Sequence, residues 1–109
     1  MDRPVGQQAL VVGAGIGGLA TARVLADYFD RVIVAERDAL PENADARAGV
    51  PQSRHVHGLL AGGQQALETL FPGFAGDLEQ AGAVRLNVSI DTRLERPGYD
   101  PFPQRDFGC

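Results

Sequence analysis

Three glycines near the N-terminus have the spacing that brings a polypeptide backbone close to a phosphate. Gly13, Gly15 and Gly18 follow the pattern G-x-G-x-x-G, which is typical of dinucleotide-binding βαβ units. The first allows a sharp turn, the second lets a pyrophosphate approach the backbone, and the third lets a helix pack closely on a strand. The residues of this turn predicted to bind the dinucleotide are Gly13, Ala14, Gly15, Ile16, Gly17 and Gly18.

The start of the helix after this turn has no side chain suited to capping it, because Ser, Thr, Asp and Asn are all missing from residues 13–18. Its free N–H groups and the positive end of its dipole therefore suit a bound phosphate. Glu36 ends the next apolar run, 36 − 18 = 18 positions after Gly18. A carboxylate about 20 residues beyond the last glycine accepts hydrogen bonds from ribose hydroxyls in this motif, so we predict that role for Glu36.

Two arginines are further candidates for the same site. Arg37 follows Glu36 directly, and it either meets the adenine end or a phosphate of a cofactor or is a solvated charge. Arg54 lies in the irregular polar segment 47–58, which we expect to return toward the nucleotide. Its guanidinium would neutralise pyrophosphate or border a ring system; the alternative is a structural ion pair.

His55 and His57 form an H-x-H pair, and in a strand both side chains would point to one side. No third ligand stands at a supporting spacing, so we predict no metal site. A hydrogen-bonding role beside a ring system and a packing role both remain open. No Ser-His-Asp or paired-carboxylate arrangement follows from the spacing, and the catalytic residues therefore remain unassigned.

The elements that position these residues follow from hydrophobic periodicity. Residues 9–12 and 31–36 read as parallel strands, joined by a helix over 16–28 whose apolar face would include Ile16, Leu19, Ala20 and Leu25. Residues 1–8 read as a loose end. This predicts an α/β fold with a Rossmann-type βαβ start and a core at about residues 8–37.

The remainder of the chain reads as helices followed by one strand. Apolar spacing predicts a helix over 58–71 that stops at Pro72 and Gly73, and a shorter helix over 74–81 closed by Gly82. Residues 84–90 alternate between apolar and polar side chains, which predicts a half-buried amphipathic strand. Residues 93–107 read as a surface loop.

Composition limits the classes of partner. The 109 residues suffice for one domain, and a net charge of −4 argues against nucleic-acid and anionic-membrane binding. No segment approaches the roughly 20 apolar residues of a membrane span. A signal peptide is a rival interpretation of residues 2–22, but it is weakened by a start that is not net basic and by five glycines. With Cys109 as the single cysteine, we expect a cytoplasmic protein.

Taken together, these segments resemble a known family. The resemblance rests on the glycine motif, on Glu36-Arg37 and on the run GVPQSRHVHGLL over residues 49–60. It extends to LETLFPG over 67–73 and PQRDFG over 103–108. The chain is similar to the start of FAD-dependent aromatic hydroxylases and epoxidases with the p-hydroxybenzoate hydroxylase fold.

The resemblance implies FAD as cofactor, with its pyrophosphate on the three glycines and its adenosine ribose on Glu36. Arg37 would lie beside the adenine, and Arg54 would approach the pyrophosphate or flavin. Members of this family use NADH or NADPH to reduce FAD and insert one atom of O₂ into a small organic substrate. The resemblance therefore implies an NAD(P)H-using flavin monooxygenase.

Family members are several times longer than this chain. We therefore expect residues 1–109 to be the N-terminal portion of an FAD/NAD(P)-binding domain, without the substrate domain. The isolated chain would bind FAD weakly and catalyse nothing without the remainder of the polypeptide. Rival interpretations are a flavin reductase or dehydrogenase and a non-catalytic nucleotide-binding module. NAD is an alternative dinucleotide, whereas Glu36 disfavours NADP because a carboxylate repels a 2′-phosphate.

Overall fold

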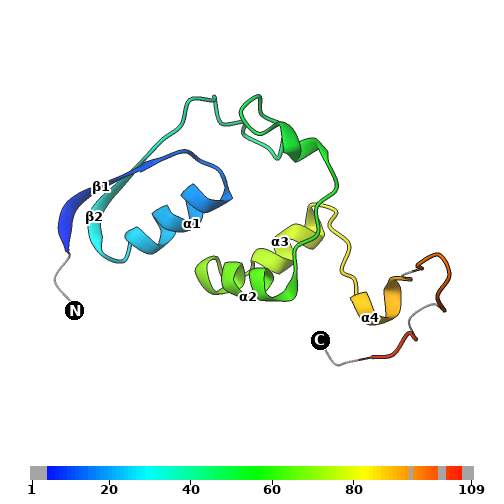
Figure 1. Cartoon of the computed structure of the whole chain (residues 1–109). Coiled ribbons are helices and arrows are strands. Elements are labelled where there is room, and N and C mark those ends of the chain that lie inside the picture. The colour runs from blue at the N-terminus through cyan, green and yellow to red at the C-terminus, as the bar shows by residue number, and fades with distance from the viewer. Residues whose placement is uncertain (1–4, 94, 101–102, 107–109) are drawn as a thin grey trace. The chain divides into compact units, whose positions relative to one another are not determined.

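The computed structural model describes residues 5–93, 95–100 and 103–106. The chain divides into two compact units, residues 1–60 and 61–109, and each is described by itself. The N-terminal unit holds both strands and one long helix, and the C-terminal unit is helical in its regular parts (Figure 1).

The N-terminal unit begins with a parallel pair of strands, which confirms the predicted α/β fold with a Rossmann-type start. Strand β1 spans Gly6–Val12 and strand β2 spans Phe29–Ala35, with Gly6 opposite Phe29 and Val12 opposite Ala35. Both strands are longer at their amino ends than predicted. Residues 6–8, expected to be a loose end, belong to β1 because their backbone groups pair with β2.

Helix α1 spans Ile16–Leu25 and connects the two strands. The predicted end at Tyr28 is three residues too far. Tyr28 N–H donates to the Leu25 carbonyl at 3.0 Å, which is the tighter i→i+3 turn common at helix ends. This turn leads the chain directly into β2.

The stripe of α1 that faces the sheet matches the predicted one only in part. Of the predicted residues, Ile16 and Leu19 are exposed, whereas Ala20 and Leu25 are half-buried. Gly18 and Ala22 are also half-buried, so Gly18, Ala22 and Leu25 share one face. These three positions follow the i, i+4, i+7 spacing of one helix face. Because glycine allows the closest approach to β1, the contact stripe runs through Gly18 rather than through the larger neighbouring side chains.

The core of this unit lies between α1 and one face of the sheet. Val11 and Ala14 are buried, and Val34, the register partner of Val11, is half-buried beside it. Alternate residues of β1 point to the other face, where Leu10 and Val12 are exposed. The packed face thus fixes the carboxyl ends of both strands next to the start of α1.

The C-terminal unit begins with a pair of packed helices. Helix α2 spans Ala61–Leu70 and helix α3 spans Phe74–Gln80. Glu68 in α2 accepts hydrogen bonds from Gly73 N at 2.6 Å and Ala75 N at 2.9 Å. These bonds hold the pKa of Glu68 below its ordinary value and fix the turn between the helices. The predicted start at residue 58 was three residues early.

The strand predicted over residues 84–90 was wrong. Residues 83–87 are irregular, and helix α4 covers Val88–Asp91. Asn87 caps this helix by accepting from Ser89 N at 3.1 Å, and Asp91 accepts from Asn87 N at 2.6 Å. Such local side-chain bonds compete with strand pairing, and the sheet of the described residues consists of β1 and β2 without this segment.

Parts of several predictions lie outside the described residues. At the N-terminus these are residues 1–4 of the predicted loose end, three of which also belong to the signal-peptide alternative. Toward the C-terminus they are residues 94, 101–102 and 107 of the loop over 93–107, the last two residues of the PQRDFG segment, and Cys109. The described residues of that loop, 93, 95–100 and 103–106, contain turns and no helix or strand. In the part of the chain that the structure describes, no helix is both long enough and apolar enough to cross a membrane.

Candidate functional site

The site is built on the turn that leaves β1. Gly13 has a φ of +99°, a left-handed conformation that glycine adopts without steric cost. Its N–H donates to the Ala35 carbonyl at 2.7 Å, so the turn is tied to the end of β2. Gly13 therefore bends the chain as predicted and brings the start of α1 beside the residue that follows β2.

Gly18 lies beneath this turn and packs against it. A methyl group added at Gly18 would overlap the carbonyl oxygen of Gly13 and lie 2.9 Å from its carbonyl carbon. It would also contact a side-chain carbon of Val11 at 3.6 Å. The third glycine of the motif is thus required by the packing of α1 on β1.

The start of α1 presents free backbone donors. Gly15 is the N-cap residue, no side chain caps the helix, and its first turn contains no acidic residue. The amides of Gly15, Ile16 and Gly17 have no hydrogen-bond partner among the described residues. Space is open beside the α-carbons of Gly15 and Gly17. Free N–H groups at the positive end of a helix dipole form an anion-binding cradle.

Glu36 faces this turn from the end of β2. Its Oε2 accepts from Ala14 N at 2.6 Å, and its Oε1 accepts from Asp38 N at 3.1 Å. These two bonds, with smaller contributions from the Arg37 backbone and the Arg47 charge, outweigh partial burial and hold the pKa of Glu36 below its ordinary value. Glu36 is therefore ionised at neutral pH and retains acceptor capacity, since a carboxylate has about four lone-pair sites.

Arg47 closes the arrangement from the opposite side. Its Nη2 donates to the Ala14 carbonyl at 3.1 Å, and its Nη1 lies 3.7 Å from Glu36 Oε2. The side chains of Arg47 and Glu36 are only 14% and 15% exposed. Glu36 therefore holds the N–H of Ala14 while Arg47 holds its C=O, and Ala14 itself is 3% exposed.

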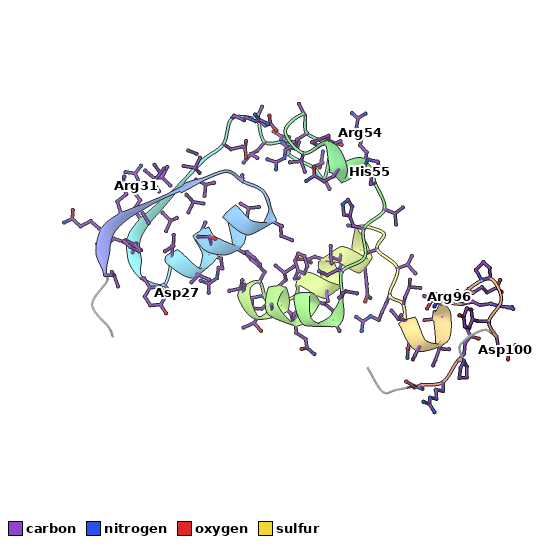
Figure 2. The ribbon with its side chains drawn as sticks, in the orientation of Figure 1. Asp27, Arg31, Arg54, His55, Arg96 and Asp100 are labelled. Atoms are coloured by element: carbon purple, nitrogen blue, oxygen red, sulfur yellow. The ribbon has the colours of Figure 1, made fainter. Side chains whose placement is uncertain are left out.

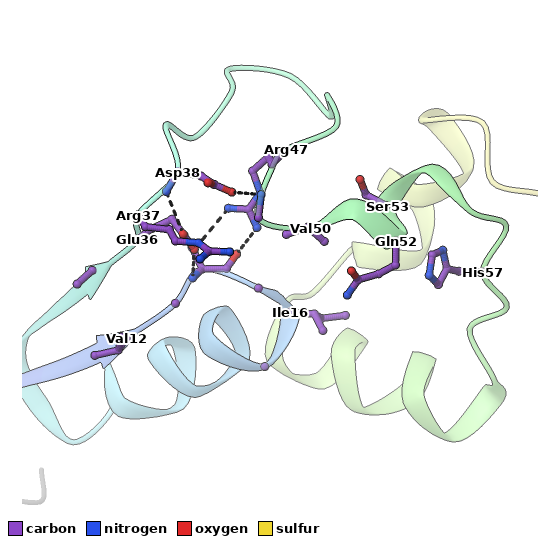
Figure 3. A pocket seen from close by; sticks show the side chains of 16 residues that line it. Val12, Ile16, Glu36, Arg37, Asp38, Arg47, Val50, Gln52, Ser53 and His57 are labelled. Carbon is purple, nitrogen blue, oxygen red and sulfur yellow. Dashed lines mark hydrogen bonds and ion pairs between the residues drawn. The ribbon is translucent and has the colours of Figure 1, made fainter.

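These residues line an open pocket of about 830 Å³ in the N-terminal unit (Figure 3). This volume lies within the range of ligand pockets. Of the predicted residues, the pocket is lined by Gly13, Ala14, Gly15, Ile16, Gly17, Glu36 and Arg37. Figure 3 shows Glu36, Arg37, Asp38 and Arg47 gathered at one part of the pocket and Gln52, Ser53 and His57 at another.

The structure does not bring Arg54 to this pocket. Arg54 ends the short 3₁₀ helix η1, which spans Pro51–Arg54, and its side chain is exposed (Figure 2). Arg37 lines the pocket but is also exposed, and both of its predicted roles stay open. Of the two arginines in the segment 47–58, the one at the glycine turn is Arg47.

The two histidines differ in position. His57 lines the pocket, whereas His55 does not. The Nδ1 atom of His57 lies 2.7 Å from the His55 carbonyl oxygen, which as an acceptor requires the proton on Nδ1. This leaves Nε2 of a neutral His57 as an acceptor. No cluster of three metal-binding side chains occurs among residues 5–93, 95–100 and 103–106.

Sequence reasoning missed four polar side chains of the pocket, which are Asp38, Arg47, Gln52 and Ser53. The one sequence feature that could have indicated these residues is that all of them lie in the polar segments just after β2 and around η1. Periodicity does not rank residues within an irregular segment, because their positions depend on where the chain folds back.

The chain is similar to segments of three known proteins. No protein-family profile matches the chain. The chain is 51% identical over 83 residues to Protein Rv3254 of Mycobacterium tuberculosis (strain ATCC 25618 / H37Rv), covering 76% of this chain and 18% of that protein. It is 34% identical over 91 residues to a glutathione reductase of Nostoc sp. (strain PCC 7120 / SAG 25.82 / UTEX 2576), covering 79% of this chain and 18% of that enzyme.

A third similarity is to the tRNA 5-methylaminomethyl-2-thiouridine biosynthesis bifunctional protein MnmC of Pseudomonas entomophila (strain L48). The identity is 41% over 73 residues, covering 67% of this chain and 11% of that protein. The chain therefore spans less than a fifth of the length of each of these curated relatives.

Proposed function

We propose that this chain binds the ADP half of FAD as part of a flavin-dependent oxidoreductase. The observation that carries the proposal is the Glu36 carboxylate, hydrogen-bonded at 2.6 Å to Ala14 N beside the uncapped start of α1. Likeness to a protein named glutathione reductase supports an oxidoreductase. FAD is supported by the motifs that resemble flavin hydroxylases.

The residues present fit the ADP group. The free amides of Gly15, Ile16 and Gly17 match the negative charge of a pyrophosphate. The space beside Gly15 and Gly17 lets the ligand approach the backbone. Glu36 lies where a ribose would meet the end of β2, and its ionised oxygens would accept from the ribose hydroxyls.

We further propose that the oxidoreductase is an NAD(P)H-using monooxygenase, a hydroxylase or an epoxidase, acting on a small organic molecule. When bound, FAD supplies the redox chemistry, and protein residues supply binding and orientation. In this chain, α1 and Glu36 would anchor and orient the adenosine end. We assign the flavin ring and the organic substrate to the remainder of a longer polypeptide, and the substrate identity remains open.

A second candidate is a flavin reductase or dehydrogenase that inserts no oxygen. The similarity to glutathione reductase favours this alternative. Turnover of a full-length protein containing this chain under isotopically labelled O₂ separates the two. Label in the organic product supports the monooxygenase, and its absence with continued NAD(P)H consumption supports the reductase or dehydrogenase.

The ADP-binding role is tested with Glu36→Gln. We expect ADP affinity to fall about 10- to 100-fold, since a charged acceptor for two hydroxyl groups is replaced by a neutral one. Affinity of the original protein should also fall as pH drops through the lowered pKa of Glu36, because protonation removes the charge. Isothermal titration calorimetry with ADP, FAD, NAD⁺ and NADP⁺ measures these affinities, with NADP⁺ expected to bind weakest.

Glu42→Gln is the matched control, because it removes one negative charge from an exposed side chain outside the pocket. Its ADP affinity should stay within about twofold of the original. Equal effects of both substitutions would mean that net charge alone governs binding. Binding of ADP but not FAD would favour a non-catalytic nucleotide-binding module.

A further inference from the structure

Asp38 makes a contact that joins two distant parts of the site. Its Oδ2 accepts from the backbone N–H of Gly49 at 2.7 Å, across 11 positions of the chain. The intervening residues 39–46 are all exposed. The Asp38–Gly49 bond therefore closes a surface loop that has little packing of its own to define it.

The fit between Asp38 and Gly49 is close. A methyl group added at Gly49 would overlap Oδ2 of Asp38 and lie 3.1 Å from its Cγ. Glycine at position 49 thus allows the carboxylate to reach the backbone donor. A larger residue there would push Asp38 away.

Arg47 and Gly49 belong to one turn. Val50 N–H donates to the Arg47 carbonyl at 3.1 Å, so residues 47–50 form a closed four-residue turn. Holding Gly49 therefore holds the backbone of Arg47. From this turn the Arg47 guanidinium reaches the Ala14 carbonyl and faces Glu36, and Figure 3 shows the chain of contacts from Asp38 to Glu36.

Asp38 is also linked to Glu36 through its own backbone. Asp38 N–H donates to Glu36 Oε1 at 3.1 Å, while the Asp38 side chain turns to the loop. Asp38 thus donates from its backbone to Glu36, the predicted ribose acceptor. Its side chain accepts from the turn that contains Arg47. Neither contact uses the amides that face the open pocket.

We propose that Asp38 is a positioning residue of the nucleotide site, which fixes the 47–50 turn so that Arg47 clamps the Ala14 peptide and Glu36. The proposal rests on the proposed function, with ADP as the ligand. Asp38 acts through Arg47 and does not itself contact the nucleotide. Its removal should therefore matter only while Arg47 is present.

The test is a double-mutant cycle read by ADP titration calorimetry. Asp38→Ala should weaken ADP binding about 5- to 20-fold, and Arg47→Gln should weaken it at least as much. The double variant should bind no more weakly than Arg47→Gln alone, because the two residues act in series. Asp38→Asn should stay within about threefold of the original, since its amide oxygen can still accept from Gly49 N.

Gly49→Ala supplies a second route to the same result, because its methyl group displaces Asp38. As a single substitution, Gly49→Ala should weaken ADP binding. Combined with Asp38→Ala, it should cause no further loss of ADP affinity. Asp45→Ala removes an exposed carboxylate of the same loop and serves as the control. Circular dichroism establishes that each variant keeps its fold.

Unchanged affinity in Asp38→Ala, or losses that add in the double variant, would overturn the proposal. A failure of the original protein to bind ADP would instead contradict the proposed function. The positioning role then has a ligand-free readout by NMR. Amide hydrogen exchange at Ala14 should speed up equally in Asp38→Ala and Arg47→Gln, and unchanged exchange in Asp38→Ala would overturn the role.

Discussion

Replacing Gly18 by alanine is expected to abolish detectable ADP binding and to lower the free energy of unfolding by about 1–3 kcal/mol. The added methyl group would overlap the Gly13 carbonyl oxygen, which is backbone, and a Cβ fixed to its own backbone has no rotamer that relieves the overlap. Helix α1 must move off β1, and the amides at its start move with it. Chemical denaturation and ADP titration measure the two effects.

Gly17→Ala is the matched control for stability. Position 17 is in the same helix, one residue away, and a methyl group there meets nothing within 4 Å. Because alanine is the better helix former, this variant should be up to about 1 kcal/mol more stable than the original protein. Equal unfolding free energies for the two variants would contradict the close packing assigned to Gly18.

Replacing Gly15 by alanine should separate binding from folding. Gly15 has φ −73° and ψ 176°, which any residue adopts, and no protein atom lies within 4 Å of an added methyl group. Stability should therefore change by less than about 0.5 kcal/mol. ADP affinity should fall at least about 30-fold, because the methyl group would enter the space through which a pyrophosphate approaches the backbone.

Gly62→Ala provides the comparison for Gly15→Ala. Gly62 lies in α2 of the C-terminal unit, again with nothing within 4 Å of an added methyl group. It should leave ADP affinity unchanged, as measured by the same calorimetric titration. Unchanged affinity in Gly15→Ala as well would mean that the pyrophosphate lies elsewhere.

The glycine turn and Glu36 could be predicted because their geometry is encoded locally. The spacing of Gly13 and Gly18 requires a bend followed by a closely packed helix, and both features are present. An apolar run with an acidic residue at its carboxyl end also places Glu36 beside that bend, since parallel strands end at the same edge. The contact between Glu36 and Ala14 N follows from this arrangement.

The sequence pointed to Arg54, whereas the arginine that reaches the glycine turn is Arg47. Both lie in the same polar segment, and the Arg47 turn is joined to the end of β2 by the long-range bond between Asp38 and Gly49. No periodic pattern encodes such a bond. Local rules therefore identified the segment that reaches the pocket and not the residue within it.

Over residues 84–90, by contrast, a strong local pattern predicted the wrong structure, because local side-chain hydrogen bonds outweighed it. Its alternation fits a strand, but Asn87 and Asp91 make side-chain bonds that begin a helical turn. A strand also needs a neighbour, and hydrophobic alternation does not supply one. A similar error placed Ile16 in the stripe of α1 that contacts the sheet, although Ile16 is exposed. The close approach of the backbone at Gly18 determines which face of α1 contacts β1.

The central claim, that the start of α1 and Glu36 together bind a dinucleotide, is tested most directly by an NMR titration with ADP that follows every backbone amide. The amides of Gly15, Ile16 and Gly17 should show the largest shifts, and those of α2 should stay unchanged. ADP binding accompanied by shifts confined to other residues, or no saturable shift at millimolar ADP, would contradict the account.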